Sequence, residues 1–326
     1  MNDTNEPLAE VTPPALPSEE VQSEAPRTDL TLFGEKIEAL KSQIASVIVG
    51  QEHTVDLVLT AILANGHVLI EGVPGVAKTL LARLTARLID ADFSRIQFTP
   101  DLMPSDVLGT TVFNMKTNEF DFHRGPVFAD MILVDEINRA PAKTQSALFE
   151  VMEERQVSID GTTYQMGELY TILATQNPVE QEGTYKLPEA QLDRFLMKIT
   201  MDYPSLEEEV DILERHHTNA ALVKLEDVRA VITRDELLTL RRLMDRVFVD
   251  RTLLQYIALI VQQTRTSKAV YLGASPRASV AMLQSSKAYA LLQGRDFVTP
   301  EDIKFVAPYV LQHRLIPVSY THLTLP

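Results

Sequence analysis

The sequence contains no cysteine and no long apolar run. Without cysteine there are no disulfides, no thiolate metal sites and no cysteine nucleophile. A transmembrane helix needs about 18 consecutive apolar residues, which this sequence does not offer. The first residues also lack the basic and apolar regions of a secretory signal. We therefore expect a cytoplasmic protein with no direct membrane insertion.

Basic residues are outnumbered by acidic residues. The chain carries 30 Lys and Arg against 45 Asp and Glu, which gives a formal net charge of −15. A protein that coats nucleic acid presents a basic surface, so we expect no nucleic-acid partner. The length of 326 residues predicts about two domains of about 150 residues each.

The two ends of the chain differ from the rest. Residues 1–28 are rich in proline and acidic residues, and they cannot bury enough apolar surface to offset the entropy of ordering. We expect a disordered acidic tail there. Residues 318–326 fit neither a helix nor a strand and resemble a translated sequencing adapter, so we expect a non-native tail.

Between these tails the pattern changes at about residue 203. Residues 67–71, 132–134 and 170–174 are short apolar runs separated by helical stretches, which is typical of buried parallel strands covered by helices. After residue 203 the strand pattern disappears and helical spacing continues. The sequence therefore predicts an α/β domain at 29–203 and a small all-helical domain at 204–317.

A glycine-rich segment follows the first apolar run and precedes a helical stretch. A phosphate-binding loop needs backbone N–H groups turned toward an anion at a helix N-terminus, a lysine for the β- and γ-phosphates, and a hydroxyl group for Mg²⁺. Ala77 stands where such loops normally have glycine, which is tolerable where its φ stays negative. The residues expected to bind the nucleotide are Gly72, Val73, Pro74, Gly75, Val76, Ala77, Lys78, Thr79 and Leu80.

Polar residues also end the second and third apolar runs. Asp135 can hold Mg²⁺ together with Thr79, and Glu136 can polarise the water that attacks the γ-phosphate. Asn177 can orient that water without adding charge, and the alternative for it is a turn residue before proline. These three side chains are our candidates for the chemistry.

Together these elements resemble the AAA+ ATPases. The stretches 101–109, 120–129, 135–140, 187–195 and 273–277 are similar to the MoxR family, a helix-2-insert clade related to magnesium chelatase ATPase subunits. The resemblance covers about residues 33–316 and implies a P-loop AAA+ parallel sheet sandwiched by helices, followed by a helical lid. The segment that matches the family's adenine contact is Val49, Gly50 and Gln51.

The resemblance also assigns roles to two arginines. Arg194 matches an arginine finger that reaches the nucleotide of a neighbouring copy, which would make hydrolysis depend on assembly. The alternative is an ion pair of Arg194 with Glu189 or Asp193 at a helix end. Arg277 matches a second sensor, expected to contact the γ-phosphate of its own chain.

The function implied by the resemblance is Mg²⁺-dependent ATP hydrolysis in a homo-oligomeric ring, a hexamer in this family. The ring would remodel or mature protein clients, with a von Willebrand factor A domain partner. Alternatives are a chelatase-type motor subunit, a nucleic-acid translocase and a nucleotide-gated scaffold without turnover. Residues 112–122 and 156–164 predict hairpins that either project toward the ring pore or a partner, or are surface hairpins only.

Overall fold

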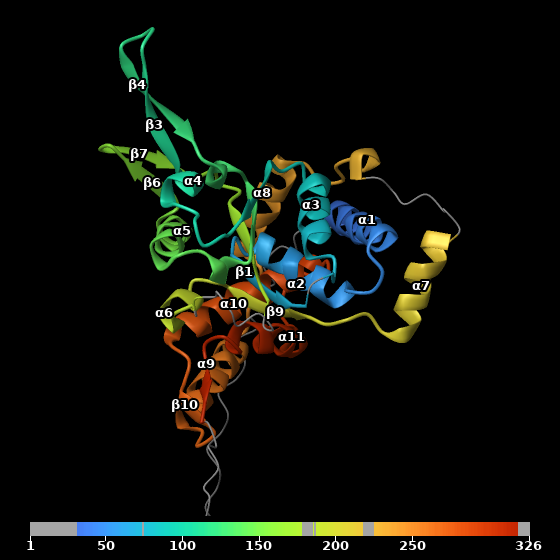
Figure 1. Cartoon of the computed structure of the whole chain (residues 1–326). Helices are drawn as coiled ribbons and strands as arrows, with labels where there is room; N and C mark the ends of the chain where they lie inside the picture. Colours follow the sequence, from blue (N-terminus) through green and yellow to red (C-terminus); the bar gives the residue numbers. More distant parts are fainter. Residues whose placement is uncertain (1–30, 74, 178–184, 186, 218–224, 319–326) are drawn as a thin grey trace, which may run out of the picture.

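The computed structural model describes residues 31–73, 75–177, 185, 187–217 and 225–318. The predicted tail at 1–28, Pro74 and all but the first residue of the predicted tail at 318–326 lie outside the described residues. A five-stranded parallel sheet forms the centre of the molecule (Figure 1). Its strand order is β2 (Phe93–Gln97), β5 (Met131–Asp135), β8 (Thr171–Gln176), β1 (Val68–Gly72) and β9 (Met197–Met201).

The sheet separates two apolar cores. Met131 and Leu133 of β5 face one core, whereas Ile132 and Val134 face the other, because successive side chains of a strand point to opposite faces. Both cores cover the strand, so all five residues of β5 are buried. This double burial explains why the central strands are continuous apolar runs in the sequence.

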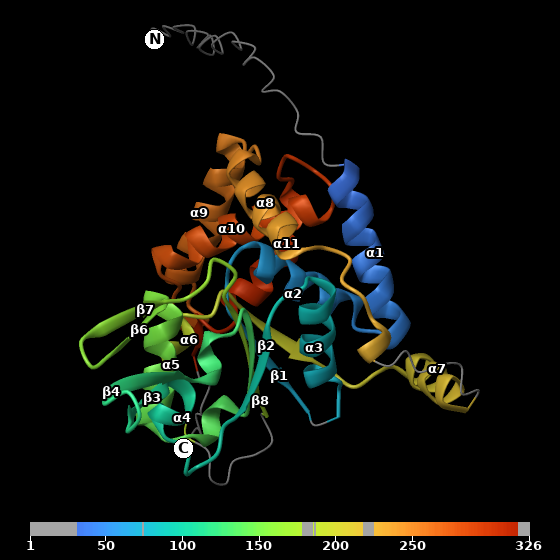
Figure 2. The same cartoon turned by 90° about the horizontal axis from the view of Figure 1, so that it is seen from above.

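Helices cover both faces of this sheet (Figure 2). The first face carries α1 (Thr31–Val47), α2 (Glu52–Leu63) and α3 (Lys78–Leu88). The second face carries α4 (Pro104–Leu108) and α5 (Ala142–Glu154). The other helical elements before residue 225 are η1 (Pro126–Phe128), η2 (Ile137–Arg139), α6 (Glu189–Leu192) and α7 (Leu206–His217). Within the described ranges, no helix has the length and apolar character needed to cross a membrane.

The mostly helical region from residue 225 onward corresponds to the expected lid, whose predicted bounds of 204–317 stay a prediction. Its helical elements are η3 (Leu225–Asp227), α8 (Arg234–Leu243), η4 (Met244–Arg246), α9 (Arg251–Thr266), α10 (Pro276–Leu292) and α11 (Pro300–Leu311). The all-helical prediction was wrong in one place, where β10 (Val270–Leu272) pairs with β11 (Ile316–Pro317) in an antiparallel ribbon. Strands this short leave no alternating apolar pattern in the sequence. Val318, the first residue of the predicted tail, extends this ribbon through its N–H, which donates to the Ala269 carbonyl at 3.0 Å.

The lid is fixed to the first helical layer of its own chain. Helix α10 packs against α2, and the lid helices share one apolar core with α1, α2 and α3. Arg241 of α8 donates through Nε and Nη2 to the carbonyl of Ile62, at 3.0 and 2.6 Å, where α2 ends. The same carbonyl also accepts from the Asn65 N–H at 3.1 Å, so these bonds add side-chain donors to the C-terminal end of α2.

Two hairpins project from the second face, as the sequence predicts. They are formed by β3 (Gly109–Asn114) with β4 (Glu119–Arg124), and by β6 (Gln156–Ile159) with β7 (Thr162–Gln165). The rings of Phe122 and Tyr164 stack with centroids 4.5 Å apart, and Thr111 Oγ1 donates to Asp160 Oδ2 at 2.6 Å. The two hairpins therefore support one another, and their role in a pore or partner contact stays a prediction.

Candidate active site

The phosphate loop connects β1 to α3. Gly75 has a φ of 90° and Ala77 a φ of 60°, both in the left-handed region. Such a conformation turns backbone N–H groups toward one side and forms a concave site for anions. Lys78 begins α3, and its Nζ donates to the Gly72 carbonyl at 2.6 Å, so the lysine lies back across the loop. Thr79 follows in the first turn, where the positive end of the helix favours an anion.

The backbone of Ala77 differs from our expectation. Its φ is positive rather than negative, and a β-carbon in the left-handed conformation costs about 1–2 kcal/mol. Ala77 is the residue that turns the chain into α3, so the geometry of the loop requires this conformation. The loop therefore holds local strain directly before Lys78.

A cavity of about 250 Å³ lies beside the phosphate loop. Gly50 and Gln51, both at positive φ, form the turn between α1 and α2 at its edge. The predicted residues that line this cavity are Val49, Gln51, Gly75, Val76, Ala77 and Leu80. Its apolar walls and backbone groups fit the base of a nucleotide.

Helix α7 supplies the other wall of the cavity, which the sequence did not predict. Ile212, Arg215 and His216 line it, and Arg215 Nη1 donates to the carbonyls of Ala45 and Ser46 at 3.2 and 3.0 Å. These bonds attach α7 to the end of α1. The sequence predicts helices after residue 203, but only the tertiary structure shows what α7 covers.

The two acidic candidates lie at the carboxyl end of β5, each beside an arginine. Asp135 Oδ2 accepts from Arg95 Nε at 2.6 Å. Glu136 has a φ of 57°, and its Oε2 accepts from Arg139 Nη1 at 2.8 Å and from Gln97 Nε2 at 2.9 Å. Hydroxyl and carboxylate oxygens are ligands that Mg²⁺ prefers, so the side chains of Thr79 and Asp135 fit the ion.

Thr175 connects the two acids and was not among our candidates. Its hydroxyl donates to Asp135 Oδ1 at 3.1 Å and accepts from the backbone N–H of Glu136 at 3.0 Å. A threonine near the carboxyl end of the strand, one residue before Gln176, was the signal for this role. Asn177 is buried just beyond the same strand, β8, which lies between β5 and β1. The structure therefore places Asn177 at the edge of the sheet that carries the phosphate loop and the acids.

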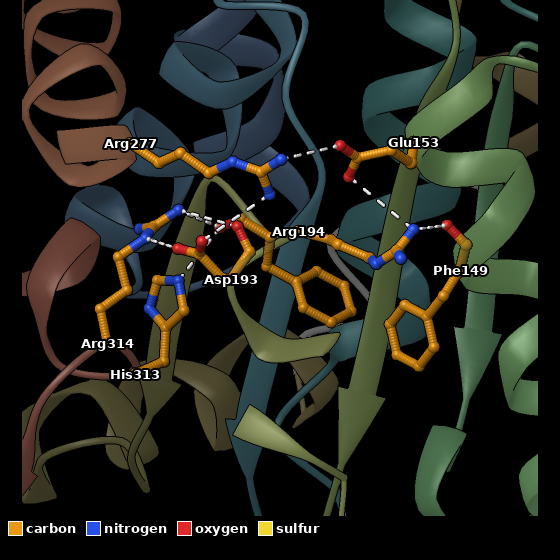
Figure 3. A network of polar contacts seen from close by, with 8 residues as sticks. Phe149, Glu153, Asp193, Arg194, Arg277, His313 and Arg314 are labelled. Atoms are coloured by element: carbon orange, nitrogen blue, oxygen red, sulfur yellow. Dashed lines mark hydrogen bonds and ion pairs between the residues drawn. The ribbon is translucent and has the colours of Figure 1, made fainter. Parts of the chain in front are cut away.

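The two arginine candidates lie together in a second cavity, of about 520 Å³ (Figure 3). Arg194 Nη1 donates to the Phe149 carbonyl at 2.5 Å and lies 3.7 Å from Glu153 Oε2. Arg277 Nη2 lies 3.3 Å from Glu153 Oε1, and its Nη1 lies 3.9 Å from Asp193 Oδ2. The ion pair of Arg194 is thus with Glu153 of α5, rather than with Glu189 or Asp193 as in the alternative from the sequence.

Arg314, just after α11, anchors the segment that carries Arg194. Its Nε donates to Asp193 Oδ1 at 2.7 Å, and its Nη2 donates to the Phe195 carbonyl at 2.7 Å. His313 Nε2 also contacts the Phe195 carbonyl at 3.0 Å. Burial lowers the pKa of His313 to about 3, so the ring is neutral at pH 7. The lid therefore fixes the backbone on both sides of Arg194.

Arg277 lies away from the phosphate loop of its own chain, whereas the resemblance implies a contact with the γ-phosphate of that chain, and its contact with a nucleotide stays a prediction. Gly66 and His67, which line the arginine cavity, precede β1, whereas the phosphate loop follows β1. The rise of a strand is about 3.3 Å per residue, so β1 alone separates the two sites by about 13 Å. The lid packs against α2, and this docking carries α10 and Arg277 to the amino end of the sheet.

The strand order, the loop between β1 and α3, and the acids after β5 define the class as an AAA+ ATPase with its lid. A model for the ATPase family associated with various cellular activities (AAA) matches residues 67–197, and an AAA lid domain model matches residues 262–322. The particular family follows from the relatives: the chain belongs to the MoxR family of AAA+ ATPases.

Three similar proteins illustrate this membership. Chaperone MoxR1 of Mycobacterium tuberculosis is 46% identical over 84% of this chain and 74% of its own. The uncharacterized protein YeaC of Bacillus subtilis is 49% identical over 87% of each chain. A crystal structure of a candidate ATPase from Cytophaga hutchinsonii aligns with a TM-score of 0.81 and 42% identity over 89% of each chain.

Proposed function

We propose that the chain hydrolyses ATP with Mg²⁺ and that each site is completed by a neighbouring copy in a ring. The observation that carries this proposal is the separation of the two halves of the site. The phosphate loop and the acids lie at one end of β1, and the two arginines lie at the other end. A γ-phosphate on the loop would therefore lie far from both guanidinium groups of the same chain.

The residues at the phosphate loop and after β5 would have different roles in phosphoryl transfer. The loop N–H groups and Lys78 bind the phosphates, and Thr79 and Asp135 would hold Mg²⁺, which neutralises developing charge when bound. Glu136 accepts a proton from the attacking water once its carboxylate is freed from Arg139 and Gln97.

The remaining groups orient the water and stabilise the transition state. Asn177 positions the water without adding charge. Arg194 and Arg277 of a neighbour stabilise the charge on the γ-phosphate, which an arginine supplied by a second molecule does strongly in related phosphoryl transfers. ATP hydrolysis would then depend on assembly of the copies.

We further propose that a ring of six copies uses this hydrolysis to remodel protein clients, with a von Willebrand factor A domain protein as partner. One similar protein is named a chaperone, which supports a protein client. Near the tip of the β3–β4 hairpin, Phe113 and Phe120 are exposed with their rings 5.2 Å apart, and they give a client or partner an apolar surface to contact.

The test is the specific ATPase activity as a function of protein concentration in the presence of Mg²⁺. We expect the activity to rise with concentration, because assembly completes the site. Arg194→Ala and Arg277→Ala should keep ATP affinity and lower kcat, for Arg194 by about a thousandfold. The matched control is Arg242→Ala, which changes an exposed lid arginine outside the cavity.

Two results would contradict the proposal. Wild-type turnover in Arg194→Ala at every concentration would show that the arginine does not act on a nucleotide. Tight ATP binding without any turnover in the wild-type chain would instead favour the nucleotide-gated scaffold.

A further inference from the structure

The arginine cavity contains a carboxylate in an unusual position. Glu153, in the last turn of α5, lies between Arg194 and Arg277 (Figure 3). Its Oε1 lies 3.3 Å from Arg277 Nη2, and its Oε2 lies 3.7 Å from Arg194 Nη1. Each oxygen of one anion therefore faces a different guanidinium group, as two oxygens of a phosphate would.

The two contacts of Glu153 are weak. Charge-assisted hydrogen bonds normally join N and O at about 2.7–2.9 Å, and both distances here are longer. The side chains are also solvent-exposed, at 38% for Glu153, 30% for Arg194 and 65% for Arg277. Exposed ion pairs of this kind contribute little free energy because water screens them.

The contacts that hold the Arg194 segment in place are stronger than those of Glu153. Arg314 is only 5% exposed, and its 2.7 Å contact with Asp193 is of normal length for a charged hydrogen bond. Arg194 keeps its 2.5 Å hydrogen bond to the Phe149 carbonyl independently of Glu153. The Glu153 carboxylate can thus leave without any change in the backbone that carries Arg194.

We propose that Glu153 is a placeholder for a nucleotide phosphate of the neighbouring copy. In the single chain it neutralises Arg194 and Arg277 and holds the two like charges together. When a neighbour presents ATP, the more highly charged phosphate displaces the carboxylate into solvent. This inference rests on the proposed function, because it assumes that both arginines act on a neighbour's nucleotide.

The consequence is a threshold for assembly. Each new contact between copies must first break the two weak contacts of Glu153, so the carboxylate competes with the neighbour's phosphate. Once the ring is complete and ATP is bound, Glu153 no longer contacts either arginine. It should therefore affect the concentration at which activity appears, and not the maximal rate.

The test compares Glu153→Gln with wild type in the assay of ATPase activity against protein concentration at saturating MgATP. The amide keeps the shape of the side chain and removes its charge. We expect the protein concentration for half-maximal specific activity to fall about threefold to tenfold, equivalent to about 0.6–1.4 kcal/mol, with kcat unchanged. Glu153→Ala should act in the same direction.

Glu154→Gln is the matched control. It removes the same charge from the next position of the helix, and in the described part of the chain Glu154 forms no ion pair with either arginine. It should leave the midpoint at the wild-type value. Thermal unfolding of each variant checks that the fold is intact.

The outcomes separate this inference from the proposed function. A lower kcat in Glu153→Gln at an unchanged midpoint would overturn the placeholder, because it would show that Glu153 positions the arginines for catalysis. A midpoint equal to that of Glu154→Gln would also overturn it. Full activity in Arg194→Ala, run in parallel, would refute the proposed function and the placeholder with it.

Discussion

Two buried histidines should make the fold sensitive to mild acid. His67 accepts a hydrogen bond at Nδ1 from the Ile172 N–H, at 3.0 Å, and its Nε2 lies 3.2 Å from the Met152 carbonyl. Burial, reinforced by the charge of Arg155, lowers its pKa to about 3. Burial and the charge of Arg314 lower the pKa of His313 to about 3.

The sign and size of the effect follow from these pKa values. An unfolded histidine has a pKa of about 6.5, so below that pH the unfolded chain binds a proton that the folded chain does not bind. Above pH 7 neither histidine binds a proton in either state, so neither lowers the free energy of unfolding. That free energy falls as the pH drops from about 6.5 toward 3. At pH 5 the loss is about 2 kcal/mol per histidine, or about 4 kcal/mol for the pair.

Urea unfolding at pH 7.5 and pH 5.0 measures this loss. His67→Gln should reduce the difference between the two pH values by about 2 kcal/mol, whatever its effect on stability at pH 7.5. The exposed His217 provides the control, since His217→Gln should keep the wild-type pH dependence. An unchanged pH dependence in His67→Gln would refute the reasoning, because it would mean that His67 titrates alike in the folded and unfolded states.

Three further variants test the phosphate loop and the acids. Ala77→Gly should raise the free energy of unfolding by about 1 kcal/mol, because it relieves the left-handed alanine; a lower melting temperature in thermal unfolding would contradict this. Thr175→Val removes a donor to Asp135 and an acceptor for the Glu136 N–H, so it should lower kcat by about ten- to a hundredfold with ATP affinity retained, and unchanged single-turnover rates would exclude this role. Lys78→Ala should abolish ATP binding by calorimetry, and retained affinity would remove the lysine from the site.

The central strands were predictable and the edge strands were not. Strand β5 is buried on both faces, so it is an uninterrupted apolar run in the sequence. Strand β2 lies at the edge of the sheet, and only Ile96 of its five residues is buried. Its sequence, Phe93–Gln97, therefore carries too few apolar residues to indicate a strand.

A similar distinction applies to the site. The phosphate loop and the acids of β5 are contiguous segments, so each carries its own pattern, and the structure gives both the expected strand and helix context. The surroundings of Arg194 and Arg277 depend on how the lid docks. That docking uses Arg241 at the end of α2 and Arg314 at the Arg194 segment. Contacts between residues more than 100 positions apart produce no local pattern in the sequence from which they could be predicted.

The central claim is that one copy completes the site of another, and mixing two inactive variants tests it most directly. Glu136→Gln retains Arg194 but should lack the general base, whereas Arg194→Ala retains Glu136 but lacks the arginine. In an equal mixture, about a quarter of the contacts in a head-to-tail ring would pair an intact Glu136 with an intact Arg194. We predict ATPase activity of about that fraction of the wild-type rate, although each variant alone is inactive. No recovery at any mixing ratio, in rings shown to contain both variants, would contradict the account.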